Sequence, residues 1–452
     1  MWIGLSSAIM LGFGWVRHAW FRSTGFDLGI YDQYAYLISQ GTPPISSFLG
    51  FHLLGDHAAW AVYPLGILYR LWPDPRALLV VQALSLALGA VPTYALARQA
   101  SLSPRASETI ALGYLLYPLL FNLSIFDFHI EVLALPALLG AIWAARSRRV
   151  GWFAVAIAWV LGCKGVLSLT VIGLGIWLLV WEKRRACGGM ALVFGIGWFV
   201  AVTQAILPAF SGEEAAAVAR YSYLGDSVVE IILNLVRQPG LVLDRVFSGE
   251  TLRYLFVLAM PLAWGLSPRH LAPLVAAVPT LLTNILSDVA AQRTLRHQYA
   301  LPILPFLIVA VIATCADRGW LHSRRFRLAA IAWSCAALLV WGKFDRFADY
   351  ARTLDTLEAT RSAIVRIETD GGVLTDNWIA PHLTHRETVQ LTGYPGYLPV
   401  DLDAIDYAVF NLRHPWPPTE QSDRDWVTRL QADPEFAIVY QHDDVYLFRR
   451  RD

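Results

Sequence analysis

Charged residues are scarce in this sequence, and so are cysteines. Only 16% of the 452 residues are charged, and 36 Lys and Arg against 35 Asp and Glu leave a formal net charge of +1. Nucleic-acid-binding proteins carry concentrated basic charge, so this balance argues against a nucleic-acid partner. The four cysteines have no CxxC or other metal-ligand spacing, which argues against a disulfide framework and a structural zinc site.

Hydrophobic residues are abundant instead. They make up 56% of the chain, a share that is rare in a soluble domain of this size. A helix needs ~20 mostly apolar residues to cross the hydrocarbon core of a bilayer. The apolar runs predict about eleven transmembrane helices, at residues 2–21, 76–98, 107–123, 132–146, 150–163, 165–181, 188–208, 253–266, 271–287, 299–315 and 328–343.

Two runs need a separate decision. The first has no basic n-region and no A-x-A cleavage site, so a transmembrane helix is expected there rather than a signal peptide. Its abrupt apolar start predicts a short further segment upstream. The run 58–72 either crosses the membrane or lies on one surface of it.

Basic residues favour the surface position for 58–72. The basic segments then share one side of the membrane, as the positive-inside rule prefers; they are 98–105, 146–149, 183–185, 269–270 and 318–327. This predicts a multi-pass protein of the plasma (inner) membrane with a cytoplasmic N-terminus. The segments expected outside are 22–75, 124–131, 209–252, 288–298 and everything after 343. A crossing 58–72 would instead put residues 22–57 inside, away from the loop 124–131.

The composition becomes more polar after residue 345. Apolar residues at helical spacing predict a helix over 350–368, and Trp426 to Leu430 indicates another. The stretches GVLTD, DYAVFNL, FAIVYQ and VYLFRR are typical of strands, the last two joined by a turn. The sequence therefore predicts an all-α transmembrane domain with interfacial helices over 1–345 and a small extracytoplasmic α/β domain over 346–452.

The first outside loop carries two carboxylates, Asp27 and Asp32, in FDLGIYDQ. Residues 28–38 predict a short interfacial helix that Gly41 and the following prolines stop. Asp27 then has an N-cap position. It is either only a cap or a general base that deprotonates an acceptor hydroxyl. Asp32 lies about 140° farther around the helix, so the two carboxylates need not face one site.

Two further segments combine imidazole and carboxylate groups. FHLLGDH and FDFHIE lie in outside loops and supply His52, Asp56, His57, Asp127, His129 and Glu131. These residue types bind divalent metals, and Asp27, Asp127 and His129 are the candidate ligands. The spacing matches no strong metal signature. A hydrogen-bonded polar layer at helix ends is the favoured alternative, recognition of substrate hydroxyls is another, and no other cofactor is indicated.

Positive groups on the outside are few. Lys164 interrupts an apolar run, and Arg293, Arg296, His297 and Tyr299 precede or begin the span at 299–315. The basic groups are candidates for holding a lipid phosphate as leaving group. The alternatives are that Lys164 snorkels at a helix turn and that Tyr299 belongs to an interfacial aromatic belt.

Three stretches, FDLGIYDQ, FDFHIEVLALP and RHQYALPILPF, resemble motifs of a prokaryotic branch of the GT-C superfamily. These integral-membrane glycosyltransferases include protein O-mannosyltransferases and aminoarabinose transferases. The resemblance covers residues 1–343 and implies a GT-C-like fold, a polyprenyl-phosphate sugar as donor and inversion at the sugar. Asp27 matches the catalytic acidic position, Asp127 a second acidic position, and Lys164-Gly165 a Lys-Gly pair at the start of a later span. Leu28 stands where the superfamily often has a second acid.

The sequence and the resemblance together predict a membrane glycosyltransferase. It would move a sugar from a polyprenyl-phosphate donor to an acceptor hydroxyl on a glycan, lipid or protein at the outer face. One alternative is a transporter or flippase for a lipid-linked sugar, but internal repeats are not evident and the charges gather at one face. The other alternative is a non-catalytic membrane protein that binds partners.

Overall fold

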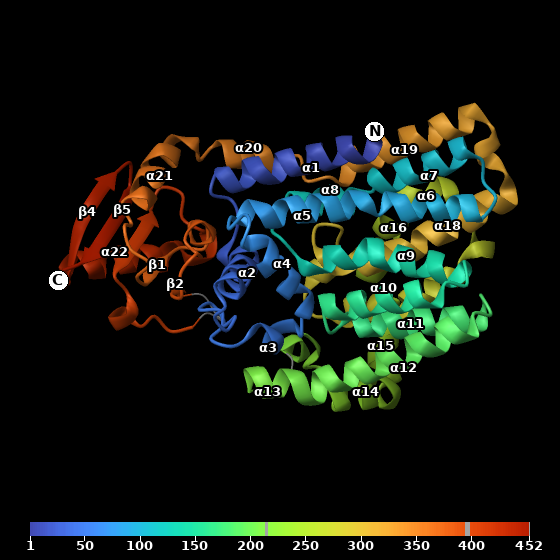
Figure 1. Ribbon diagram of the computed structural model, residues 1–452, viewed down its shortest axis with the longest axis horizontal. Helices are drawn as coiled ribbons and strands as arrows, with labels where there is room; N and C mark the ends of the chain where they lie inside the picture. Colours follow the sequence, from blue (N-terminus) through green and yellow to red (C-terminus); the bar gives the residue numbers. More distant parts are fainter. Residues whose placement is uncertain (213–215, 394–397, 452) are drawn as a thin grey trace.

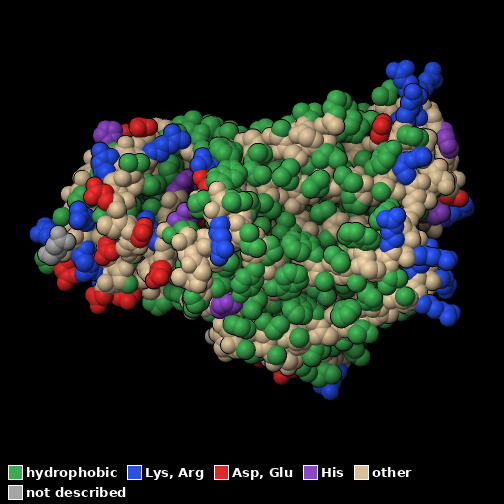
Figure 2. Space-filling view, viewed as in Figure 1, with side chains coloured by type: hydrophobic (Ala, Val, Ile, Leu, Met, Phe, Trp, Pro, Cys, Tyr) green, Lys and Arg blue, Asp and Glu red, His purple; other side chains and the backbone are tan. Residues whose placement is uncertain are grey.

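A helical domain and a smaller sheet domain lie end to end in the computed structural model, which describes residues 1–212, 216–393 and 398–451 (Figure 1). Most helices of the first domain run along the long axis of the molecule, and the sheet domain covers one end of them. The surface of the helical domain is largely apolar, and charged side chains gather at its two ends (Figure 2). This architecture confirms the predicted fold class.

The helical domain is built from many helices of unequal length. The elongated bundle contains α1 (Trp2–Ala19), α5 (Pro75–Leu88), α6 (Ala90–Gln99), α7 (Pro104–Leu115), α8 (Pro118–Ser124), α9 (Ala134–Arg146), α10 (Val150–Cys163), α11 (Leu167–Val180), α12 (Arg185–Ala201), α13 (Leu207–Ser211), α16 (Gly249–Ala259), α17 (Val278–Leu286), α18 (Leu304–Arg318) and α19 (Arg324–Trp341). The shorter helices beside it are α2 (Ile30–Gln40), α3 (Leu53–His57), α4 (Tyr63–Tyr69), α14 (Val228–Arg237) and α15 (Pro239–Val246).

Each predicted span overlaps at least one of these helices, but the lengths differ. Within the described residues, three stretches are long and apolar enough to cross a membrane: Pro75–Gln99, Arg185–Ser211 and Gln298–Arg318. The number rises to five if two bent helix pairs each count as one span. Prolines explain part of the shortening. Tyr117 is extended (φ −66°, ψ 123°) before Pro118, which divides the expected span 107–123 into α7 and α8.

The first outside loop folds as an interfacial layer. A π-helical turn, Gly25–Gly29, leads into α2, and Gly41 ends α2 in the left-handed region with φ 78°. Asp27 lies inside the π-turn, so the expected N-cap position is wrong; the cap positions are Thr24 and Gly29. The apolar helix Trp60–Tyr69 has ten residues, too few for a full crossing, which favours the surface position of 58–72.

The C-terminal domain contains one five-stranded sheet. Its order is β2 (Val389–Leu391), β1 (Val373–Thr375), β3 (Tyr407–Asn411), β5 (Val445–Arg450) and β4 (Phe436–His442). β1 is parallel to β2 and β3, whereas β5 is antiparallel to β3 and β4. The helices of this domain are α21 (Leu357–Val365) and α22 (Glu420–Ala432), while α20 (Arg346–Ala351) connects the domain to the bundle and packs on α1 through Phe347 and Phe13. Two apolar clusters pack on the two faces of the sheet. Ala380, Val389 and Leu391 of this domain belong to the core cluster of the bundle.

The two domains are joined by backbone and side-chain hydrogen bonds at the first outside loop. Gly25 N–H donates to the carbonyl oxygen of Asn377 at 2.8 Å, and Phe26 N–H donates to Asn377 Oδ1 at 3.1 Å. A Cβ atom on Gly25 would lie 2.8 Å from Ala380 Cβ, so the close approach requires glycine. The segment after β1 is therefore fixed against the loop that carries Asp27.

Candidate active site

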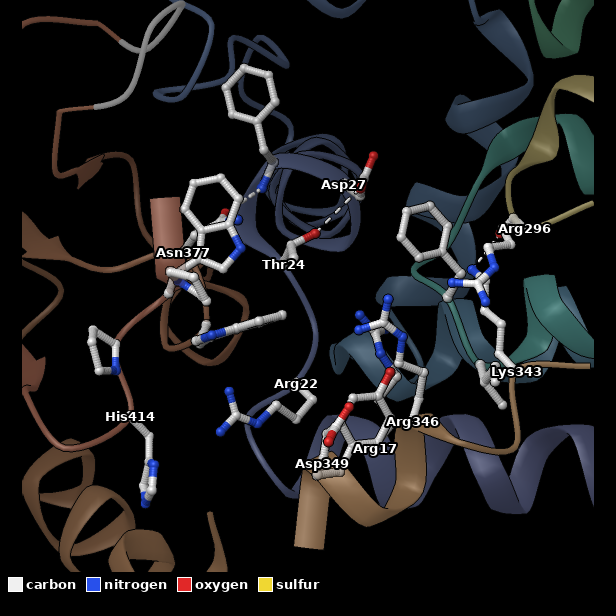
Figure 3. Close-up of a pocket in the computed structure, with 18 of the residues that line it drawn as sticks. Arg17, Arg22, Thr24, Asp27, Arg296, Lys343, Arg346, Asp349, Asn377 and His414 are labelled. Atoms are coloured by element: carbon white, nitrogen blue, oxygen red, sulfur yellow. Dashed lines mark hydrogen bonds between the residues drawn. The ribbon is translucent and has the colours of Figure 1, made fainter. Parts of the chain in front are cut away.

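A cavity of about 830 Å³ opens where the two domains meet (Figure 3). The helical domain lines it from the end of α1, the π-turn and the loops around residues 126 and 297. The C-terminal domain lines it from residues 377–378 and 413–420. Among the residues proposed from the sequence, Asp27, Arg296 and His297 line this cavity.

Asp27 presents a partly exposed carboxylate to the cavity. Its side chain is 35% exposed, and Asp27 Oδ1 lies 3.4 Å from His129 Nε2. His129 Nδ1 lies 2.8 Å from the carbonyl oxygen of Asp127. Because a carbonyl only accepts, Nδ1 carries a proton, and an attractive contact with Asp27 requires a second proton on Nε2. At 3.4 Å the two groups are within ion-pair distance but form no hydrogen bond among the described residues, so they are a carboxylate–imidazolium pair when His129 is protonated.

Electrostatics agree with this pair. Burial raises the pKa of Asp27, but His129, Arg17 and His297 outweigh burial, so the pKa lies below the usual aspartate value. Burial lowers the pKa of His129, and Asp27 with Glu131 outweighs burial and raises it. Both groups are therefore charged at pH values between the pKa of Asp27 and the pKa of His129. The ion pair is lost when the pH falls through the pKa of Asp27 or rises through that of His129.

Asp127 has a different environment from Asp27. It is fully buried and accepts from Arg17 Nη1 at 2.7 Å, from Arg17 Nη2 at 3.0 Å and from the Thr24 amide at 3.1 Å. The Thr24 hydroxyl lies 2.7 Å from Asp127 and 3.4 Å from Asp27, so its single proton serves Asp127. Asp127 thus ties α1, the π-turn and the 125–129 loop together, while Asp27 keeps accepting capacity toward the cavity.

Asp32 lies on the other side of the domain junction. It is fully buried in α2, accepts from Tyr69 Oη at 2.5 Å and from the Thr384 hydroxyl, and lies 3.2 Å from His385 Nε2. These partners use both of its oxygens. Asp32 does not line the Asp27 cavity, and its contacts make it an interdomain anchor.

Lys164 pairs with a carboxylate rather than lining the cavity. Its Nζ donates to Glu131 Oε1 at 2.6 Å, with side chains 14% and 7% exposed. Burial raises the pKa of Glu131, and Lys164 with His129 outweighs burial and lowers it to about 2. Gly165 N–H donates to the carbonyl oxygen of His57 at 2.8 Å. The Lys-Gly pair therefore holds two outside loops together.

The remaining proposed residues are dispersed around this centre. His52 caps α3 through Nδ1 and stacks on Phe210, while Asp56 lies 3.3 Å from His57. Arg293 donates to Glu250 at 3.0 Å and to the carbonyl oxygen of Ser287. Arg220 lies over the Tyr299 ring at 5.5 Å. The cavity lining within the described residues includes none of the side chains named in this paragraph.

Comparisons with known proteins agree with this architecture. The family model "Predicted membrane protein (DUF2079)" matches residues 17–447. The chain belongs to the DUF2079 family. Crystal structures of ArnT from Cupriavidus metallidurans are similar: the form bound to undecaprenyl phosphate has a TM-score of 0.59 at 15% identity, and the apo form 0.57 at 14%. Both alignments cover 99% of this chain and 97% of that chain, so the GT-C-like fold is shared. A comparison with curated proteins gives no match.

No metal-ligand cluster stands out in this member of the DUF2079 family. Across residues 1–212, 216–393 and 398–451, no group of three or more His, Cys, Asp or Glu side chains is arranged to hold a metal ion. Of the three proposed ligands, Asp127 is paired with Arg17, and Asp27 is paired with His129. Their ligand atoms already serve as partners within the protein.

Several cavity residues escaped the sequence analysis. On the helical side these are Arg17, Arg22, Lys343 and Arg346, and on the other side Asn377, Trp378, His414 and Trp416. Arg17 had a usable signal, because an arginine inside the apolar run 2–21 is costly and needs a partner. The residues of the C-terminal domain had none, because only the fold brings them to Asp27.

Proposed function

We propose that this protein is a membrane glycosyltransferase that uses a polyprenyl-phosphate sugar as donor. One observation carries the proposal: a carboxylate poised as a base and a group of cations line the same cavity at one end of the bundle. Arg296, Lys343 and Arg346 supply the positive charge that a phosphate leaving group needs. The fold shared with ArnT, a protein crystallised with undecaprenyl phosphate, supports this class of lipid.

The reaction follows from these positions. The acceptor hydroxyl gives its proton to the Asp27 carboxylate, and its oxygen attacks the anomeric carbon of the donor. The bond between that carbon and the phosphate oxygen breaks, and polyprenyl phosphate leaves with the electron pair. The cations stabilise the charge that develops on the phosphate. His129 keeps Asp27 ionised and fixes its direction.

The same proposal assigns an orientation in the plasma (inner) membrane. Basic side chains gather at the end of the bundle opposite the C-terminal domain (Figure 2). Arg98, Arg105, Arg148, Arg149, Lys183 and Arg185 are exposed among the segments that the positive-inside rule places in the cytoplasm. The cavity and the C-terminal domain are then extracytoplasmic, where the apolar donor tail reaches the lipid around the bundle.

A direct assay tests the function. Purified protein is incubated with a panel of polyprenyl-phosphate sugars and amphiphilic acceptors, and released polyprenyl phosphate and glycosylated acceptor are quantified. We expect at least one donor to give both products in equal amounts. A transporter or flippase would move the donor across a vesicle membrane and leave it intact. If every donor stays intact and is moved across the bilayer, the transporter hypothesis would replace the glycosyltransferase hypothesis.

His129 sets the pH range of the reaction. In His129→Asn, burial of Asp27 remains while its cationic partner is lost, so the pKa of Asp27 rises. The acidic limb of the kcat/KM profile is then expected to move up by about 1 pH unit or more. His414→Asn is the matched control, because His414 also lines the cavity but lies 2.7 Å from Asp355 of the C-terminal domain. Equal profiles for the two variants would contradict this role of His129.

A further inference from the structure

The two walls of the cavity differ in how their charges are compensated. On the helical side, Arg22, Arg296, Lys343 and Arg346 form no ion pair within the described part of the chain. Their polar contacts are neutral: Arg22 Nε donates to Thr353 Oγ1 at 3.2 Å, and Lys343 Nζ donates to the carbonyl oxygen of Arg296. This wall therefore keeps a net positive charge for an anionic ligand.

The wall from the C-terminal domain is internally neutralised. Arg413 lies 2.9 Å from Asp444 and 3.3 Å from Asp355, and His414 Nε2 lies 2.7 Å from Asp355. Glu420 lies 3.1 Å from Arg424. Each charged group of this wall thus has an opposite partner in its own domain, so the wall suits an uncharged ligand.

This wall is also the ligand-binding edge of its sheet. Asn377 and Trp378 follow β1, and Arg413 and His414 follow β3, which is parallel to β1. In open α/β sheets, ligands bind outside the carboxyl ends of the parallel strands. The C-terminal domain therefore turns its binding edge toward the cavity that contains Asp27.

Trp378 gives the wall a ligand-binding group. Its indole Nε1 is buried and has no hydrogen-bond partner among the described residues. A buried donor without a partner is costly. One ring face is covered by Arg22, whose guanidinium carbon lies 5.2 Å from the ring centroid. An aromatic ring next to an amide, here Trp378 beside Asn377 in the cavity wall, is a surface that binds sugar rings through apolar contact and hydrogen bonds.

We propose that the C-terminal domain binds the acceptor, and that this acceptor is an uncharged, hydroxyl-rich glycan. The inference rests on the proposed function and adds the place and class of its second substrate. Asp27 lies between Asn377 on one wall and Arg296 on the other in Figure 3. The base therefore lies between the donor phosphate and the acceptor wall. The transfer requires this order, because the base must face the attacking hydroxyl and the cations must face the leaving group.

Trp378→Phe tests the assignment, because it keeps an aromatic ring but removes the indole N–H and part of the ring area. The probes are octyl glucoside, octyl mannoside and octyl galactoside as neutral acceptors, and octyl glucuronide as an acidic one, with a donor that the enzyme cleaves. We expect the neutral-acceptor concentration for half-maximal transfer to rise about fivefold. Donor half-saturation and acceptor-independent hydrolysis of the donor should stay unchanged. Trp426→Phe, in α22 of the same domain and absent from the cavity wall, is the matched control.

The outcomes separate this inference from the proposed function. A shift in donor half-saturation for Trp378→Phe, or an equal acceptor shift for Trp426→Phe, would overturn the placement of the acceptor. Preference for octyl glucuronide, or hydrolysis of the donor that no neutral glycoside accelerates, would overturn the acceptor class and leave the donor chemistry intact. Absence of polyprenyl phosphate release under every condition would defeat the proposed function, and the acceptor site with it.

Discussion

Asp27→Asn is expected to lower the rate of sugar transfer at least about 100-fold while the protein remains folded. General-base catalysis contributes roughly 10²–10⁴ to a rate, and an amide cannot take the proton of the acceptor hydroxyl. The side chain is 35% exposed in the cavity, and its polar contacts within the described residues are His129 and Thr24, each at 3.4 Å. The isosteric change should therefore leave thermal unfolding close to that of the wild type.

Asp349→Asn is the matched control for this variant. Asp349 also lines the cavity, but its carboxylate is 53% exposed and lies 3.5 Å from Arg352. It should keep nearly normal transfer, because the proposed mechanism gives it no proton to take. Rates are compared at saturating donor, so that donor binding does not enter. Full activity of Asp27→Asn would remove the base from this position, and Asp127 could not replace it because it is already bound to Arg17.

The sequence predicted which loops meet but not how their charges pair. Shared membrane side was enough to bring Asp27 and the FDFHIE segment together, and the structure places His129 3.4 Å from Asp27. Sequence neighbours nevertheless have different partners. Arg293 ends a 3-10 turn and faces Ser287 and Glu250, whereas Arg296, beyond an extended residue, lines the cavity. The backbone conformation of the three residues after Arg293 decides which arginine reaches the cavity, and this conformation could not be predicted from the composition.

The fold of the tail was predictable in outline for a similar reason. In four strands and both principal helices, the apolar residues recur with the period of the secondary structure. The turn at Asp443 and Asp444 has φ values of 48° and 60°, as a tight hairpin requires. β2 was missed because three residues, Val389–Leu391, are too few to show alternation. The contribution of Asn377 and Trp378 to the cavity was not predictable, since about 350 residues separate them from Asp27.

Removal of the unpaired arginines is the second change with a large expected effect. Arg296→Ala and Arg346→Ala should each raise the donor concentration for half-maximal transfer at least tenfold, because a hydrogen bond to a charged group is worth about 1.5–3 kcal/mol. Arg413→Ala is the matched control. It removes an arginine from the same cavity, but one that is already paired with Asp355, Asp443 and Asp444. Its donor dependence should be close to normal.

Lys164→Ala separates a phosphate contact from a structural one. Lys164 was a candidate phosphate ligand, yet it lies against Glu131 at 2.6 Å and does not line the cavity. Its loss leaves a buried carboxylate unpaired, so we expect a free energy of unfolding lower by about 3 kcal/mol and a donor half-saturation that hardly changes. Donor titrations and thermal unfolding of Arg296→Ala and Lys164→Ala measure both effects. A larger donor shift for Lys164→Ala than for Arg296→Ala would move the phosphate site to the Glu131 side of the domain junction.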